Sequence, residues 1–200
     1  MPRRLAVLSC APILLATALL PALSAQTPAK TLTVRLDPAQ TEIHWTLGDV
    51  LHTVRGTFAL KSGTITFDPA SGHADGAVIV DLDSGNSGNA TRDRLMKQNI
   101  LQTARYPQAI FHPQKFAGLL HPGADQTITV DGTLTVHGED HPSELVMTVT
   151  ALSANHATAT TRFVVPYVAW GMKDPSTFVL RVEKQVTVDV TAQGTVEGLP

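Results

Sequence analysis

Residues 87–107 read SGNATRDRLMKQNILQTARYP, and they predict a helix in a chain whose other regions predict strands. Ser87 and Asn89 are candidate N-caps, because a side-chain oxygen can accept the free backbone N–H groups of a first helical turn. Apolar residues then recur at helical spacing, and Pro107 disfavours helical geometry in the residue before it. We therefore expect one short helical insertion near residues 89–103.

A helix with a single apolar side can take two positions in a protein made of strands. It can pack on the surface of a sheet, or it can plug the open end of a barrel. The helix pattern alone is compatible with both positions. Its apolar side consists of Leu95, Met96, Ile100 and Leu101, whereas Arg92, Arg94, Lys97 and Gln98 can face water.

Alternating apolar and polar residues predict antiparallel strands before and after this helix. The alternation begins at Leu32 and includes a strand over residues 74–83 and a long last strand over residues 177–191. Residues 138–142, GEDHP, are expected to connect two later strands as a hairpin. Eight or more strands and one helix in a single domain indicate a closed barrel or a sandwich.

The first 25 residues have the pattern of a secretory signal peptide. Two arginines precede an apolar run over residues 5–23, and the sequence ALSA at 22–25 suits cleavage before Gln26. Residues 26–30 would then form a short leader. We expect a periplasmic or secreted protein.

Two alternatives to ordinary cleavage exist. A membrane anchor is disfavoured because Pro12 and Pro21 interrupt the apolar run, so we expect no stable membrane span after cleavage. A lipid anchor at Cys10 is the second alternative, although few apolar residues precede this cysteine.

The composition of the chain after the expected signal peptide argues against several classes of protein. Cleavage removes Arg3, Arg4 and the single cysteine, which leaves 13 basic and 17 acidic residues and a net charge of −4. Without a thiol, this chain has no disulfide and no cysteine nucleophile or metal ligand. The mild acidity and the lack of a lysine or arginine run argue against nucleic acid as a partner.

No arrangement of residues in the sequence indicates catalysis. There is no G-x-S-x-G motif, and Asp81 and Asp83 share one face of a predicted strand, which we expect to face solvent. His137 and His141 straddle a turn and do not have a spacing that converges on one ion. We predict no catalytic residue, no metal and no cofactor.

Four segments, in their order along the chain, resemble the YceI-like family of secreted bacterial proteins. They are residues 43–47 with 54–58, residues 88–93 with 106–111, residues 130–138, and the ending from 163–166 through 170–171 to 186–190.

The resemblance extends over about residues 31–193 and implies a single antiparallel lipocalin-like β-barrel of about eight strands, followed by a tail at 194–200. It also implies that the barrel binds a long amphiphile, with polyisoprenoids as the ligand class. Leu95-Met96 and residues 99–102 differ from the histidine and aromatic residues that the family often has there.

The resemblance and the apolar pattern together predict the residues that contact the ligand. We expect a carrier of an apolar or amphiphilic small molecule, either as a monomer or as a homodimer. A stress-related interaction module and a histidine-based metal-binding protein are the alternatives. The predicted contact residues are Trp45, Leu47, Phe58, Val80, Leu95, Met96, Ile100, Leu101, Phe111, Trp170 and Phe178.

Overall fold

The computed structural model describes residues 31–48, 52–153 and 156–198. The expected signal peptide and leader, residues 1–30, lie outside these ranges. The helix consists of α1 (Ala90–Leu95) and the π-helical η1 (Met96–Leu101). The strands are β1 (Leu32–Leu36), β2 (Glu42–Gly48), β3 (Thr53–Asp68), β4 (His73–Asn86), β5 (Gln108–Ala117), β6 (Gln126–Val136), β7 (Glu139–Ser153), β8 (His156–Val165) and β9 (Val186–Glu197).

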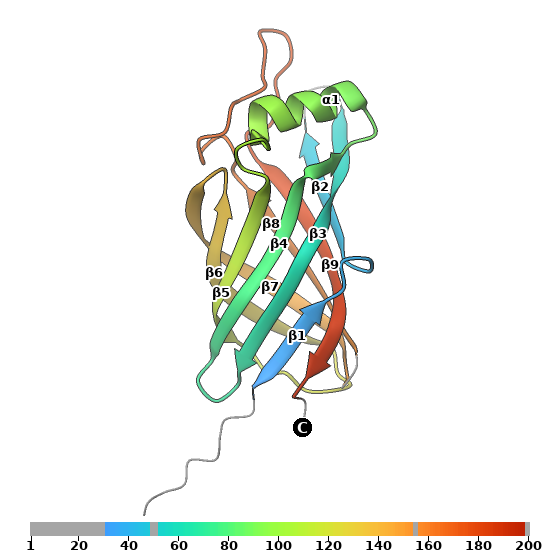
Figure 1. The fold of residues 1–200 in the computed structure, drawn as a ribbon, viewed down its shortest axis with the longest axis vertical. Helices are drawn as coiled ribbons and strands as arrows, with labels where there is room; N and C mark the ends of the chain where they lie inside the picture. The colour runs from blue at the N-terminus through green and yellow to red at the C-terminus, as the bar shows by residue number, and fades with distance from the viewer. Residues whose placement is uncertain (1–30, 49–51, 154–155, 199–200) are drawn as a thin grey trace, which may run out of the picture.

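β1 and β2 share one position in a closed ring of strands (Figure 1). Each pairs antiparallel with β3 on one side and with β9 on the other. The ring continues in the order β3-β4-β5-β6-β7-β8-β9, so the strands occupy eight positions. The prediction of an antiparallel barrel of about eight strands is confirmed, and the sandwich is excluded.

A turn at residues 37–41 separates β1 from β2 without opening the ring. The Asp37 N–H donates to the Gln193 carbonyl oxygen (2.8 Å), and the Thr41 hydroxyl donates to the same oxygen (3.3 Å). The Asp37 carboxylate accepts the Gln40 side-chain amide, and this bond lowers the pKa of Asp37. The turn therefore stays hydrogen-bonded to β9, and the sheet has no free edge at this point.

A hydrophobic core fills the end of the barrel opposite the helix. Val130 on β6 is fully buried, and the rings of Phe67 and Phe116 meet edge to face with centroids 5.1 Å apart. This core closes one end of the barrel. Its other buried members are Leu32, Ile65, Ala74, Phe111, Ile128, Leu145, Val149, Leu152, Ala157 and Val196.

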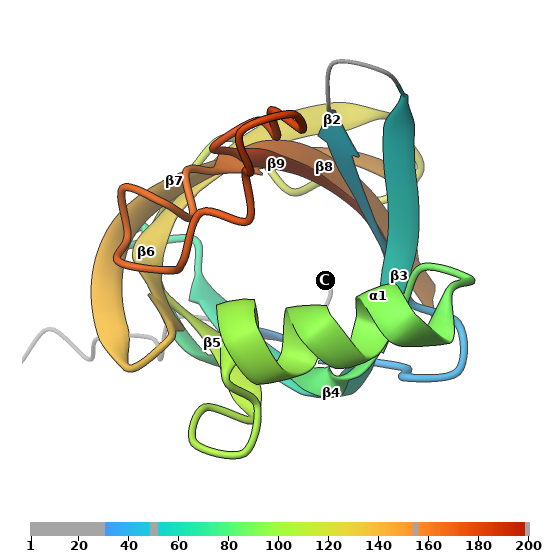
Figure 2. The same cartoon turned by 90° about the horizontal axis from the view of Figure 1, so that it is seen from above.

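The predicted helix is confirmed, and it lies across the other end of the barrel (Figures 1 and 2). Its apolar side faces the barrel interior, where Ile100 and Leu101 pack against a second buried cluster that includes Leu82 and Tyr167. Of the two positions that the sequence allowed, the structure therefore has the helix at the barrel end. No helix among the described residues is long and apolar enough to cross a membrane.

The two candidate N-caps of this helix have different roles. Asn89 is the N-cap, and its side-chain oxygen accepts the Arg92 N–H (3.0 Å). Ser87 donates its N–H (2.9 Å) and its hydroxyl to the Asp93 carboxylate. The helical turns end at Gln102, whose left-handed φ of 49° stops them before the proline that the sequence identified as the stop.

The predicted boundaries of the last strand are wrong. Residues 177–185 lie in the loop between β8 and β9, and β9 begins at Val186. Their apolar alternation belongs to a tight hairpin, in which the Thr177 N–H donates to the Leu180 carbonyl oxygen (2.8 Å). β9 runs to Glu197 and thus includes four residues that the sequence analysis assigned to the tail.

The hairpin between β6 and β7 is shorter than predicted. Its turn consists of His137 (φ 55°) and Gly138 (φ 82°), and residues 139–142 belong to β7. Two consecutive positive φ values are typical of the two-residue turn whose twist matches the flanking strands.

Closure of the barrel depends on the close approach of β1 to β9 at Gly194. A Cβ atom at this position would overlap the Arg35 carbonyl oxygen. We predict that Gly194→Val lowers the free energy of unfolding by about 1–3 kcal/mol, because the backbone of β1 must move. Urea unfolding followed by circular dichroism measures the change. Gln193→Val is the control, and an equal loss in both variants would contradict the role of Gly194.

Candidate ligand-binding site

An interior cavity of about 1010 Å³ extends along the barrel between the hydrophobic core and the helix. Its volume is at the upper end of the roughly 300–1,000 Å³ of typical small-molecule sites. The inward side chains of every strand position contribute to its wall, and nearly all of them are apolar. Its deep part is lined by Leu32, Ile65, Phe67, Ile128, Leu145, Val149, Leu152 and Val196.

Small inward side chains make room for this cavity. An eight-stranded barrel is just wide enough for its own side chains to fill it. Here Ala109, Ala157, Ala159 and Ala192 line the cavity, and Ala159 lies opposite Ala192 across the β8–β9 pair. These four positions are residues that the sequence analysis missed, and small residues at inward strand positions are the signal that could have found them.

Trp45 on β2 forms part of the cavity wall. Its indole lies over Gly56 on β3, where a Cβ atom would overlap the ring. The Phe58 ring is 6.3 Å away, centroid to centroid. Trp45 is only 5% exposed, and its Nε1 atom is a buried donor with no hydrogen-bond partner among the described residues. A single donor without an acceptor leaves this wall effectively apolar.

The helix forms one side of the cavity mouth. Gly85 at the end of β4 makes room for two inward side chains, because a Cβ atom there would come within 2.7 Å of both Met96 and Phe58. Arg92 also borders the cavity, and its guanidinium donates to the Ser87 hydroxyl (2.7 Å) and carbonyl oxygen (2.8 Å). Asn89, Thr91 and Asn99 add polar groups at the same rim.

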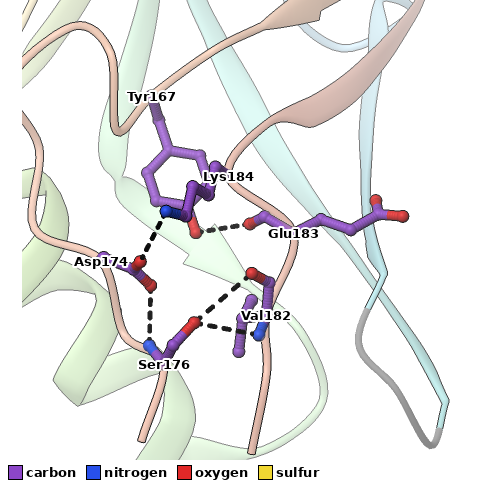
Figure 3. Close-up of polar contacts among 6 residues, drawn as sticks. All are labelled: Tyr167, Asp174, Ser176, Val182, Glu183 and Lys184. Atoms are coloured by element: carbon purple, nitrogen blue, oxygen red, sulfur yellow. Dashed lines mark hydrogen bonds and ion pairs between the residues drawn. The ribbon is translucent and has the colours of Figure 1, made fainter.

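The loop between β8 and β9 forms the facing side of the mouth (Figures 2 and 3). The Tyr167 hydroxyl donates to the Glu183 carbonyl oxygen (2.7 Å) and so ties the start of the loop to its end. Ser176 accepts the Val182 N–H (3.0 Å) on its hydroxyl, and its own N–H donates to the Asp174 carboxylate (2.8 Å). The bonds from Ser176 lower the pKa of Asp174.

Nine of the eleven predicted contact residues line the cavity. Two do not, and their prediction as inward contacts is wrong. Trp170 stacks on His141 with ring centroids 3.9 Å apart and lies outside the lining. Phe178 is 101% exposed, because the segment predicted as a strand is a hairpin turn. The nine are Trp45, Leu47, Phe58, Val80, Leu95, Met96, Ile100, Leu101 and Phe111.

The histidines at the β6–β7 hairpin pack against aromatic rings. The His137 ring is 4.6 Å from the Tyr106 ring, and His141 lies parallel to Trp170. Both Nε2 atoms are buried and have no hydrogen-bond partner among the residues that the structure describes. No group of three or more His, Cys, Asp or Glu side chains that could hold a metal ion occurs in the described part of the chain.

The fold and the cavity together define a class, that of single-domain antiparallel barrels with an apolar interior and a helix at one end. Within that class, the chain belongs to the YceI-like family, because the YceI-like domain model matches residues 35–194. The family resemblance seen in the sequence is confirmed. No curated protein is significantly similar to the chain in sequence.

Solved structures with the same fold include proteins from three organisms. A polyisoprenoid-binding domain from Saccharophagus degradans, implicated in plant cell wall breakdown, is 21% identical with a TM-score of 0.66, covering 83% of this chain and 98% of that one. BcnA from Burkholderia cenocepacia is 20% identical with a TM-score of 0.64, covering 80% and 99%. The Campylobacter jejuni YceI protein is 19% identical with a TM-score of 0.59, covering 72% and 85%.

Tyr167 gives the loop an alkaline pH dependence. Burial, together with the nearby Asp174 charge, raises the pKa of Tyr167 from 10.0 to about 12. Because the folded state favours the neutral phenol, its contribution is complete below pH 10 and is lost as the pH rises through about 12. We predict that Tyr167→Phe lowers the free energy of unfolding by about 1 kcal/mol at neutral pH, since one hydrogen bond is lost.

The difference between the wild type and Tyr167→Phe should shrink between pH 10 and about 12. Urea unfolding at several pH values measures it, and Tyr106→Phe is the control for the other tyrosine. Parallel pH profiles for the wild type and Tyr167→Phe would contradict the raised pKa.

Proposed function

We propose that this protein is an extracytoplasmic binding or carrier protein that holds a long apolar or amphiphilic molecule, a polyisoprenoid or another lipid, inside its barrel. The observation that carries the proposal is the apolar cavity of about 1010 Å³. The Saccharophagus degradans domain, which has the same fold, is described as polyisoprenoid-binding. The extracytoplasmic location rests on the signal-peptide pattern of residues 1–25.

Burial of the hydrocarbon chain supplies the affinity in this proposal. Each CH₂ group removed from water contributes roughly 0.8 kcal/mol. A wall of aliphatic and aromatic side chains offers few directional bonds, so it selects ligands by length and width. Trp45, Phe58 and Phe111 would contact the chain of the ligand.

The polar end of an amphiphile would lie at the mouth. The apolar side of the helix continues the cavity wall up to the rim, where Asn89, Thr91 and Asn99 provide hydrogen-bonding groups. The helix thus separates an apolar interior from a polar opening, as a site for a molecule with one polar end requires. The proposal includes no catalytic residue, metal or cofactor.

Filling the cavity tests the proposal. Ala159→Phe places a ring in the wall opposite Ala192, so we predict roughly tenfold weaker binding of farnesol, a short isoprenoid alcohol. Quenching of Trp45 fluorescence in a Trp170→Phe background measures binding, since Trp45 lines the cavity and Trp170 does not.

The matched control is Val164→Phe on the same strand. Val164 is 48% exposed and does not line the cavity, so this variant should bind farnesol as the wild type does. Circular dichroism checks that both variants fold. Equal binding by Ala159→Phe and Val164→Phe, or no binding by the wild type, would contradict a ligand inside the barrel.

A further inference from the structure

The hairpin at the mouth exposes two large apolar side chains at its tip. Phe178 is 101% exposed and Val179 is 88% exposed. They are the central residues of the turn, which is closed by the bond from the Thr177 N–H to the Leu180 carbonyl oxygen (2.8 Å) and by one from the Leu180 N–H to the Thr177 hydroxyl (3.0 Å). Neither residue lines the cavity.

Polar bonds hold the base of this hairpin in place (Figure 3). Ser176 bridges to both backbone groups of Val182, and Lys184 pairs with Asp174 (3.8 Å). The Glu183 N–H donates to the Gly48 carbonyl oxygen on β2 (2.9 Å), which ties the hairpin to the barrel. The tip is therefore presented outward by a braced segment.

The loop between β8 and β9, which carries the tip, projects from the open end of the barrel beyond the ends of the strands (Figure 1). Leu180 and Val182, which follow the tip, line the cavity. An apolar surface that contacts Phe178 and Val179 would thus lie directly beside the mouth through which a ligand must pass.

The two segments at the mouth are basic, whereas the rest of the chain is acidic. Residues 87–107 have four basic residues and one acidic residue, and residues 166–185 have three basic and two acidic. The remainder of residues 31–200 has five basic and 14 acidic residues. An anionic surface would therefore be attracted to these two segments and repelled by the strands of the barrel.

Several of the basic side chains in these two segments are exposed to solvent. Lys173 and Arg181 on the hairpin and Arg94 on the helix are all exposed. Four carboxylates of the strand ends also lie at this end of the barrel, namely Asp81, Asp83, Glu139 and Asp140. All four belong to β4 or β7, whereas Lys173, Arg181 and Arg94 lie on the loop and the helix.

We propose that the Phe178–Val179 tip inserts into an anionic lipid bilayer, so that the barrel mouth docks on the membrane that supplies or receives the ligand. Two apolar residues are far too few for a protein–protein interface of roughly 800 Å² per partner, but they suit shallow insertion between headgroups beside cationic side chains. The inference rests on the proposed function, because a long isoprenoid resides in membranes.

Vesicle co-sedimentation tests this docking. We expect the wild type to sediment with vesicles that contain phosphatidylglycerol, less with pure phosphatidylcholine vesicles, and less at high salt. The double variant Phe178→Ser/Val179→Ser should bind the phosphatidylglycerol vesicles at least roughly tenfold more weakly than the wild type, since two apolar side chains are lost. Leu119→Ser is the matched control, because Leu119 is 68% exposed in the loop at the closed end.

Farnesol binding, measured in solution without vesicles, separates this inference from the carrier proposal. The tip variant should bind farnesol as the wild type does, because neither changed residue lines the cavity. If the wild type binds farnesol but the tip variant still binds vesicles, docking through the tip is overturned and the carrier proposal stands. The same conclusion follows if the wild type binds farnesol but no vesicles. Tip-dependent vesicle binding without farnesol binding supports docking and overturns the carrier proposal. Equal loss in Leu119→Ser overturns the role of the tip.

Discussion

The pairing of β9 with both β1 and β2 is the constraint on which the rest of the structure depends. It joins the first and last strands, so the sheet has no open edge and its inner face is shielded from water. Gly194 allows the backbones to approach at β1, and the turn at residues 37–41 keeps its hydrogen bonds to β9. Because the ring is closed, the inward side chains must either fill the interior or leave a cavity.

Both outcomes occur in this barrel, one at each end. Phe67 and Phe116 pack tightly at the closed end, whereas alanines at inward positions such as 159 and 192 leave space for the cavity. The helix and the β8–β9 hairpin border the opening, and each contributes both apolar and polar side chains to the lining of the cavity. The same two segments carry most of the basic residues of residues 31–200, so the opening of the cavity and these basic residues lie at the same end of the molecule.

The sequence predicted the features that depend on local chemistry. Asn89 is an N-cap because its side chain bonds three residues ahead, and the four apolar helix residues share a side for the same local reason. The residue pattern did not distinguish a barrel from a sandwich, because closure depends on pairing between the first and last strands. The resemblance to the family predicted the barrel. Phe178 was misplaced because a short alternating segment can form either a strand or a hairpin turn.

The central claim is that the barrel holds an apolar molecule in its interior. Native mass spectrometry of the purified protein, followed by organic extraction, tests this claim most directly. We predict a species heavier than the chain by the mass of one lipid-like molecule, which organic solvent releases and which added isoprenoid restores. A protein that is found empty and that takes up no added isoprenoid would contradict it.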